Sequence, residues 1–124
     1  MKGIELLKQY PKAGEVVLEW YKDKMKASLN SETLTEEIKE SFKGFTVGNE
    51  HMGTIIDNNP RMLFDVFDEN DLYIEILVNY ESNSAKFTYT VIDDEILSNT
   101  TNYASRKDAE TAAIELAFKL LNDK

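Results

Sequence analysis

The sequence predicts a single α+β domain, residues 1–124, in which N-terminal helices precede a three-stranded antiparallel meander and a C-terminal helix packs on the sheet. Two observations predict this class. The 124 residues, 42% hydrophobic and 30% charged, have the length and composition of one globular domain. The apolar residues follow helical spacing before residue 60, alternate after it, and return to helical spacing near the C-terminus. The expected order from residue 49 is α-β-β-β-α, with residues 1–48 as a helical extension.

The chain is expected to begin with two helices. An apolar turn at residues 4–7 ends at Tyr10, because the residue before a proline is pushed out of the helical region. Pro11 suits the first turn of a new helix. Apolar residues on more than one side of residues 11–29 predict that this second helix is buried near the centre of the fold.

Two more helices are expected before the sheet. Thr33 and Glu36 are spaced as a capping box, which begins a helix that Gly44 ends. Residues 49–58 have apolar positions at helical spacing and form the next helix. The turn residues at positions 58–60 end it.

The β-pattern follows in three runs, residues 63–68, 72–80 and 85–92, which are rich in β-branched and aromatic residues. One face of this meander is apolar and requires a covering helix. It is expected to carry Phe64, Val66, Ile74, Ile76, Val78, Tyr80, Phe87, Tyr89 and Val91. The other face mixes apolar and charged residues. We expect the N-terminal helices to cover it in part, and the alternative is a contact surface. The next segment is compatible with a fourth, edge strand around residues 95–99 and equally with a polar loop.

The last helix is the best-defined element of the sequence. Ser105 is an N-cap, with Asp108 at the third helical position. Apolar residues, many of them small, then recur at helical spacing: Ala109, Ala112, Ala113, Leu116, Ala117, Leu120 and Leu121. Small residues allow this helix to approach the sheet closely.

Negative charge is concentrated in one part of the chain. A net charge of −7, out of −9 for the whole chain, belongs to residues 60–95, where the bases are Arg61 and Lys86. The nine acids of this stretch are Asp65, Asp68, Glu69, Asp71, Glu75, Glu81, Asp93, Asp94 and Glu95. The expected product is a sheet whose rim and turns repel phosphate and attract basic surfaces.

Acidic and aromatic residues occur together at the start of this stretch, and aromatic anchors ringed by acids suit a basic protein partner. The candidate partner-binding residues are Asp65, Phe67, Asp68, Glu69, Asp71, Tyr73 and Glu75. Phe67 and Tyr73 are expected to be surface aromatics on one sheet face, unless the helical extension buries that face. A homodimer through Leu63, Phe67, Tyr73 and Leu77 is also left open, since uncovered apolar patches favour association.

The residues available for chemistry are few. The chain has no cysteine and a single histidine, His51, which disfavours thiol nucleophiles, thiolate zinc sites and histidine-dependent catalysis. None of the five scattered glycines forms a phosphate-binding loop. We therefore expect no metal, no cofactor and no enzymatic activity, with a carboxylate-based enzyme as the least favoured class. No apolar run suits a signal peptide or a membrane span, which predicts a cytoplasmic protein without membrane contact.

Residues 105–114 resemble the final helix of the double-stranded RNA-binding domain, and the order of elements expected from residue 49 is similar to that domain in shape. The resemblance implies that a cluster at the start of this helix clasps phosphates and that the loop at residues 68–71 enters a minor groove. The nucleic-acid-binding residues would be Ser105, Arg106 and Lys107. Because that loop is acidic here, as are Asp108 and Glu110, direct nucleic-acid binding is disfavoured and duplex RNA binding is the alternative function.

Three segments resemble small uncharacterised proteins encoded by phages and prophages of Bacteroidales-type bacteria: residues 4–11, 63–70 and 105–110. This resemblance implies a role in the contest between phage and host, where short acidic proteins occupy nucleic-acid channels. Together with the charge pattern, it predicts a non-enzymatic interaction protein of phage or mobile-element type. In the sharpest form this is an anti-CRISPR-like inhibitor that binds a basic, nucleic-acid-handling host protein in the host cytoplasm.

Overall fold

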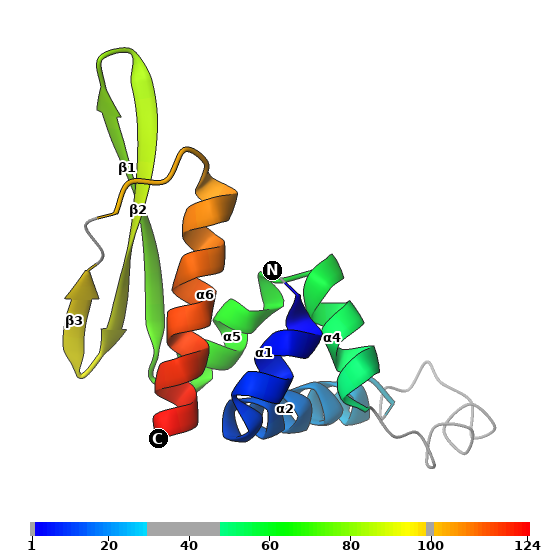
Figure 1. The fold of residues 1–124 in the computed structure, drawn as a ribbon. Helices are drawn as coiled ribbons and strands as arrows, with labels where there is room; N and C mark the ends of the chain where they lie inside the picture. The colour runs from blue at the N-terminus through cyan, green and yellow to red at the C-terminus, as the bar shows by residue number, and fades with distance from the viewer. Residues whose placement is uncertain (1, 30–47, 99–100) are drawn as a thin grey trace.

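A computed structural model describes residues 2–29, 48–98 and 101–124 of the chain. The fold is α+β, with helices on one side of the molecule and a small antiparallel sheet on the other (Figure 1). The elements in chain order are α1 (Gly3–Gln9), α2 (Pro11–Leu29), α4 (Asn49–Asn58), α5 (Met62–Glu69), β1 (Tyr73–Glu81), β2 (Ser84–Asp93), β3 (Glu95–Ser98) and α6 (Arg106–Asp123).

The sheet is built on a long hairpin of β1 and β2, which pair from Tyr73 opposite Ile92 to Glu81 opposite Ser84. The two-residue turn, Ser82 and Asn83, has φ values of 51° and 63°. Positive φ at both central positions is the signature of the turn whose twist matches the twist of paired strands. The four-residue β3 pairs with the end of β2, so the strand order is β1-β2-β3 and β1 is an edge strand.

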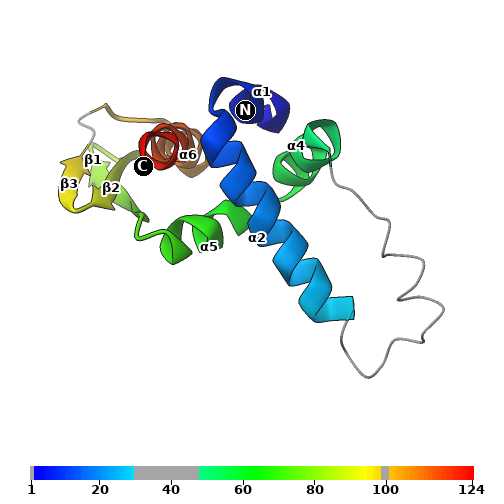
Figure 2. The same ribbon diagram turned by 90° about the horizontal axis from the view of Figure 1, so that it is seen from below.

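Helix α6 lies between the sheet and the other helices (Figure 2). On its sheet side, Ala113 is buried against Tyr89 and Val91 of β2, and Ile74 and Ile76 of β1 pack around them. On its other side, α6 supplies part of a larger core. That core joins buried residues of α1, α2, α4, α5 and α6, and its largest members with no exposed surface include Phe67, Phe118, Met52, Ile56 and Leu63.

Polar contacts tie the helices to one another. The backbone N–H of Gly3, at the start of α1, donates to Asp57 Oδ1 of α4 over 2.7 Å. The side-chain oxygen of Asn122, near the end of α6, accepts from the N–H groups of Lys12 (2.9 Å) and Ala13 (3.3 Å) at the start of α2. These donors belong to a first helical turn, where the helix itself supplies no acceptor. Asn122 therefore caps α2 through the tertiary structure.

Most helix predictions are confirmed. The turn before Tyr10, the helix from Pro11 and the helix of residues 49–58 are present as α1, α2 and α4. The Ser105 cap of α6 is also confirmed, because its Oγ accepts from the N–H of Asp108 over 3.1 Å. The helix expected between Thr33 and Gly44 lies outside the described residues. For the segment after β2, the structure has the short strand β3.

The predicted first strand, residues 63–68, is wrong, because these residues form helix α5 and the expected meander is therefore not present. Leu63, Val66 and Phe67 are buried, while Asp65 and Asp68 are exposed. The buried positions 63, 66 and 67 lie on one side of a helix, which has about 3.6 residues per turn. They do not follow the two-residue alternation of a strand. The β-branched and aromatic composition of this run had indicated a strand, but its spacing decided the structure.

The predicted partial cover of the second sheet face by the N-terminal helices is also wrong for the helices that the structure describes. Helix α6 packs against β1 and β2, and α5 contacts β1, whereas α1, α2 and α4 lie on the far side of α6 (Figures 1 and 2).

Among the helices in the described ranges, none has the length and apolar character that crossing a membrane requires.

Candidate functional site

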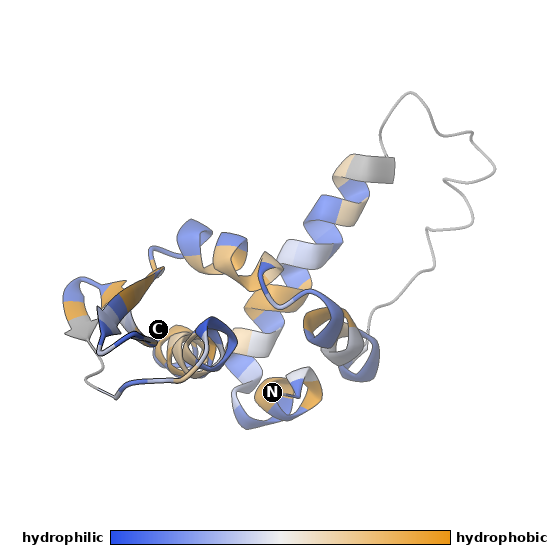
Figure 3. Cartoon of the chain, turned by 90° about the horizontal axis from the view of Figure 1, so that it is seen from above, coloured by the Kyte–Doolittle hydropathy of each residue, from blue (hydrophilic) through white to orange (hydrophobic). Residues whose placement is uncertain are grey.

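Exposed apolar side chains gather on the sheet. Five large hydrophobic residues are exposed in the described part of the chain, and all five belong to strands: Tyr73, Leu77, Val78, Tyr80 and Ile96. The exposed fraction of the residue reaches 68% at Tyr80 and 72% at Ile96. Hydrophobic residues, in orange in Figure 3, accordingly appear on the strands as well as between the helices. The sheet is therefore the candidate interaction site, since exposed apolar side chains that gather in one part of a protein are typical of such sites.

One group of these residues lies on the sheet face that points away from α6. The strand register places Tyr73, Glu75 and Leu77 of β1 on this side, with Ile92 of β2 and Ile96 of β3 beside them. We call this surface the open face. It combines three of the exposed hydrophobic residues with the exposed carboxylate of Glu75.

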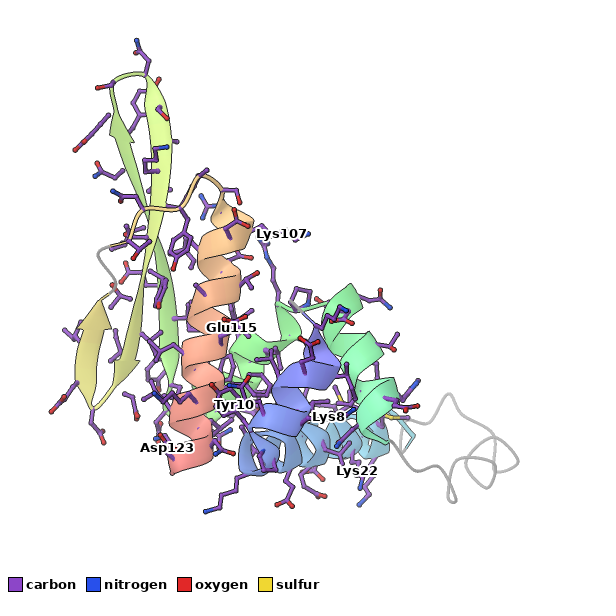
Figure 4. All side chains as sticks on the ribbon, viewed as in Figure 1. Lys8, Tyr10, Lys22, Lys107, Glu115 and Asp123 are labelled. Carbon is purple, nitrogen blue, oxygen red and sulfur yellow. The ribbon has the colours of Figure 1, made fainter. Side chains whose placement is uncertain are left out.

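A second group lies where the hairpin extends past the start of α6. Residues 77–81 of β1 are exposed without interruption, and their side chains stand out beyond the helix in Figure 4. We call residues 77–88 the arm. Val78 and Tyr80 are on the same side as the buried Tyr89 and Val91, and were expected to lie under the C-terminal helix. That expectation is wrong, because α6 begins below them and leaves Val78 and Tyr80 exposed (Figure 1).

The acids of the charged stretch are divided between two elements. Asp65, Asp68 and Glu69 lie on α5, and the other six belong to the sheet and its turns. Residues 71–98 contain six acidic residues and one basic residue, so the sheet region has a net charge of −5. Two of the nine acids form ion pairs: Glu69 with Lys24 at 3.5 Å and Asp93 with Lys124 at 3.0 Å. The other seven form no ion pair within the described ranges.

A group of charges surrounds Lys124 at the base of the sheet. Lys124, the last residue, donates a hydrogen bond to Asp93, and this bond raises the pKa of its ammonium group above the usual 10.5. The negative charges of Asp93, Asp94 and Asp71 act in the same direction, while burial lowers the pKa without reversing the shift. The carboxylates of Asp71, Asp93 and Asp94 are therefore close enough to Lys124 to raise the pKa of its ammonium group.

Asp93→Asn is expected to bring the pKa of Lys124 back toward its ordinary value, since the leading cause of the shift is removed. A pH titration of the Lys124 side chain by NMR measures this change, with Asp23→Asn on α2 as the matched control. Because the folded-state pKa is the higher one, the pair stabilises the fold below pH 10.5 and stops doing so as the pH rises through the raised pKa. An unchanged Lys124 titration in Asp93→Asn would contradict the contact.

The candidate partner-binding residues are thus only partly brought together. Tyr73 and Glu75 share the open face, and Asp71 lies just before β1 in a left-handed conformation, with φ of 60°. The α5 acids lie on a different element. The prediction that Phe67 is a surface aromatic is wrong, because this residue has no exposed surface. Its ring packs edge-on against the ring of Phe118, with the ring centres 5.8 Å apart.

Two of the four residues of the homodimer surface predicted from sequence are also buried and cannot contribute to it. Leu63 and Phe67 are both fully buried on α5, which leaves Tyr73 and Leu77 exposed. Val78 and Tyr80 are exposed although their position in the sequence predicts that they are covered. They continue the alternation of the covered residues Ile74 and Ile76, so no periodicity separates the covered part of β1 from the uncovered part.

Two of the three residues of the alternative site, Ser105 and Arg106, have structural roles at the start of α6. The hydroxyl of Ser105 is occupied as the N-cap, and the guanidinium of Arg106 lies over the ring of Phe87, 5.4 Å from its centre. Lys107 is exposed (Figure 4). The acidic loop at residues 68–71 lies near the other end of α6, so the two contacts implied by the RNA-binding resemblance are not on one side of the molecule (Figure 1).

A shallow hollow of about 480 Å³ next to these residues contains a further base, Arg61. Arg61 pairs with Glu110 at 3.1 Å, and only 13% of the Glu110 side chain is exposed. Glu110 thereby offsets part of the positive charge that Arg61, Arg106 and Lys107 bring to the hollow.

No constellation for metal chemistry emerges from the described residues, since no three His, Cys, Asp or Glu side chains there are arranged to hold an ion. His51 is exposed on α4.

Trp20 packs at the edge of the larger core and lines an open hollow of about 680 Å³ between α2, α5 and α6. Its indole N–H is buried without a hydrogen-bond partner, and the ammonium of Lys24 lies 5.5 Å from the ring centre.

Comparison with known proteins finds no matching family model, no matching curated protein and no matching solved structure. The resemblances to phage proteins and to the double-stranded RNA-binding domain therefore stay predictions.

Proposed function

We propose that this chain is a non-enzymatic interaction protein that binds a basic surface of a nucleic-acid-handling protein through its sheet. The observation that carries the proposal is the gathering of all exposed large hydrophobic side chains of the described residues on strands that hold a net charge of −5. Apolar anchors and charges contribute differently to such binding. Fully burying a residue such as Leu77 supplies about 1.5–3 kcal/mol, whereas the carboxylates mainly select a basic partner and speed its approach.

A nucleic-acid-binding protein is the partner class that fits this surface chemically. Such proteins present clustered lysine and arginine to phosphates, and a carboxylate surface competes for the same groups. In the narrowest form of the proposal, the partner is a defence component of a bacterial host, and the chain is a phage-encoded inhibitor that acts in the host cytoplasm. The phage origin and the location rest on the sequence resemblance alone.

The test compares two charge-reversed variants that have the same net charge. Glu75→Lys combined with Glu81→Lys changes β1, while Glu15→Lys combined with Asp23→Lys changes exposed acids of α2. Each immobilised protein is exposed to a panel of purified basic nucleic-acid-binding proteins and to acidic proteins of similar size. We expect the unchanged chain to retain members of the basic group, with about tenfold weaker retention by the β1 variant.

The α2 variant serves as the control and is expected to bind like the unchanged chain. Excess duplex DNA is expected to displace the chain, since it would occupy the partner's basic surface. Equal losses in the two variants would show that only net charge matters, and retention of no basic protein would leave the proposal without a partner class. Either result would overturn it.

Duplex RNA binding through Ser105, Arg106 and Lys107 is the second candidate function, supported by the meeting of two of these residues with Arg61 at the shallow hollow. It ranks lower because Glu110 pairs with Arg61 and because the acidic sheet repels phosphate. Duplex RNA is therefore added to the panel in a low-salt gel-shift assay. A salt-sensitive shift that Arg106→Gln with Lys107→Gln abolishes would place this function first.

A further inference from the structure

The outer edge of β1 is open along the arm. β1 is the first strand in the order β1-β2-β3, so among the described strands it has a neighbour on one side only. Every residue from 77 to 81 is exposed, whereas Ile74 and Ile76, nearer the base, pack against the cores. An edge strand presents a row of backbone groups that can pair with another strand.

The hairpin turn determines which backbone groups point outward. A two-residue turn makes Glu81 and Ser84 exchange both of their hydrogen bonds, and such mutual pairs recur at every second residue of an antiparallel ladder. Leu77 and Asn79 therefore direct their N–H and C=O groups toward β2. Those of Val78 and Tyr80 point away from β2, to the open edge.

Nothing in the described part of the chain occupies this edge. No hydrogen bond to the backbone of Val78 or Tyr80 comes from a described residue outside the hairpin ladder. Both residues are also more than half exposed, at 52% and 68%. The edge thus offers two donors and two acceptors, together with apolar surface beside them.

We propose that the arm binds its partner by strand addition, in which an extended segment of the basic protein pairs with β1 at Val78 and Tyr80. The inference rests on the proposed function and gives its binding mode. Main-chain hydrogen bonds supply affinity in this mode, and the alternate side chains of the added strand supply specificity.

The surroundings of the edge define the sequence of the added strand. Its residues opposite Val78 and Tyr80 lie on the side that carries Ala85 and Phe87, which is apolar. Its residues opposite Leu77, Asn79 and Glu81 lie on the open-face side. There β1 supplies the carboxylates of Glu75 and Glu81, and the nearest base, Lys86, is one strand further away on β2. Apolar residues that alternate with lysine or arginine fit both sides at once.

The charge of β1 favours such a segment over a second copy of this chain. The nine residues of β1 include Glu75 and Glu81 and no base, and each copy has a net charge of −9. Pairing two such edges would bring like charges together, whereas a basic segment meets opposite charge along the same strand.

A defined peptide tests the mode directly. The probe is a blocked seven-residue peptide in which lysine alternates with valine, compared with a peptide of the same composition whose lysines and valines form two blocks. We expect the alternating peptide to bind the full chain about tenfold more tightly in a fluorescence anisotropy titration. We also expect it to slow amide hydrogen exchange about tenfold at Val78 and Tyr80, with little change at the already paired Leu77 and Asn79.

Val78→Pro removes one outward donor without removing a hydrogen bond of the hairpin, because proline is tolerated on an edge whose N–H faces solvent. We expect this variant to lose about tenfold in peptide affinity, and Val78→Ala, which keeps the donor, less than threefold. Should Val78→Pro disturb the hairpin, methylation of alternate backbone nitrogens in the peptide removes the same hydrogen bonds from the other partner.

The possible outcomes separate this inference from the proposed function. Binding of the basic panel that depends on Glu75 and Glu81 but survives Val78→Pro, with no protection of the Val78 and Tyr80 amides, would refute strand addition and leave the proposed function intact. Equal binding of both peptides would also refute it. Concentration-dependent dimers that Val78→Pro dissolves would assign the edge to a second copy instead.

Discussion

Replacing Phe67 with alanine is expected to lower the free energy of unfolding by about 3–5 kcal/mol. The side chain has no exposed surface and packs edge-on against Phe118, with ring centres 5.8 Å apart. The substitution removes these contacts and leaves a cavity between α5 and α6. Small domains are stable by roughly 5–15 kcal/mol, so the loss is a large part of the total.

Urea unfolding followed by circular dichroism measures this loss, with Tyr73→Ala as the matched control. Tyr73 is the other aromatic of the predicted partner site, and 46% of its surface is exposed. Its removal is expected to change the unfolding free energy by less than about 1 kcal/mol. If Phe67→Ala were as mild as Tyr73→Ala, Phe67 would be a surface residue and the first prediction from sequence would stand.

Gly53→Ala is expected to destabilise the protein by about 1–3 kcal/mol, the second-largest effect. A Cβ atom at this position would lie 2.8 Å from the backbone nitrogen of Ile4 and 3.0 Å from its Cα. Since these are backbone atoms, α1 and α4 would have to move apart. A Cβ atom at Gly3 would meet the carbonyl oxygen of Gly53 at 2.6 Å, so the two glycines permit one close helix crossing.

The sign of this effect makes the measurement informative. Helix propensity alone predicts that alanine in α4 stabilises the protein by about 0.8–1 kcal/mol relative to glycine. Thermal and urea unfolding of Gly53→Ala therefore distinguish packing from propensity. Gly48→Ala is the control for the close contact, because nothing lies within 4 Å of a Cβ atom there, and we expect it to cost less than about 1 kcal/mol, since Gly48 is the N-cap of α4 and alanine is a poorer cap. A stabilised Gly53→Ala variant would contradict the close contact of α1 with α4.

The helices with clear local signals could be predicted from sequence. Pro11, Ser105 and the turn after Asn58 act within a few residues of the helix end that each one sets, so their effect does not depend on the rest of the fold. Helix α5 shows where this reasoning fails. Its aromatic and β-branched residues suit a strand, but the positions of Leu63, Val66 and Phe67 suit one buried helical stripe.

The candidate site could be predicted only as a region. The acidic stretch and its aromatic residues pointed to residues 60–95, and Tyr73 and Glu75 lie on the open face. Val78 and Tyr80 could not be singled out, because their side chains follow the same alternation as the covered residues Ile74 and Ile76 of the same strand. Their exposure depends on where α6 begins relative to the hairpin, which is a relation between distant segments.

Local pattern was sufficient for the charge distribution, most helix boundaries and the two long strands, because propensity, capping and periodicity act over a few neighbouring residues. Packing in three dimensions placed α6 over one half of one sheet face and drew Phe67 into the core. It also left the open face and the arm exposed. Burial depends on which distant elements meet, and their meeting minimises exposed apolar surface over the whole fold, which no single stretch of sequence specifies.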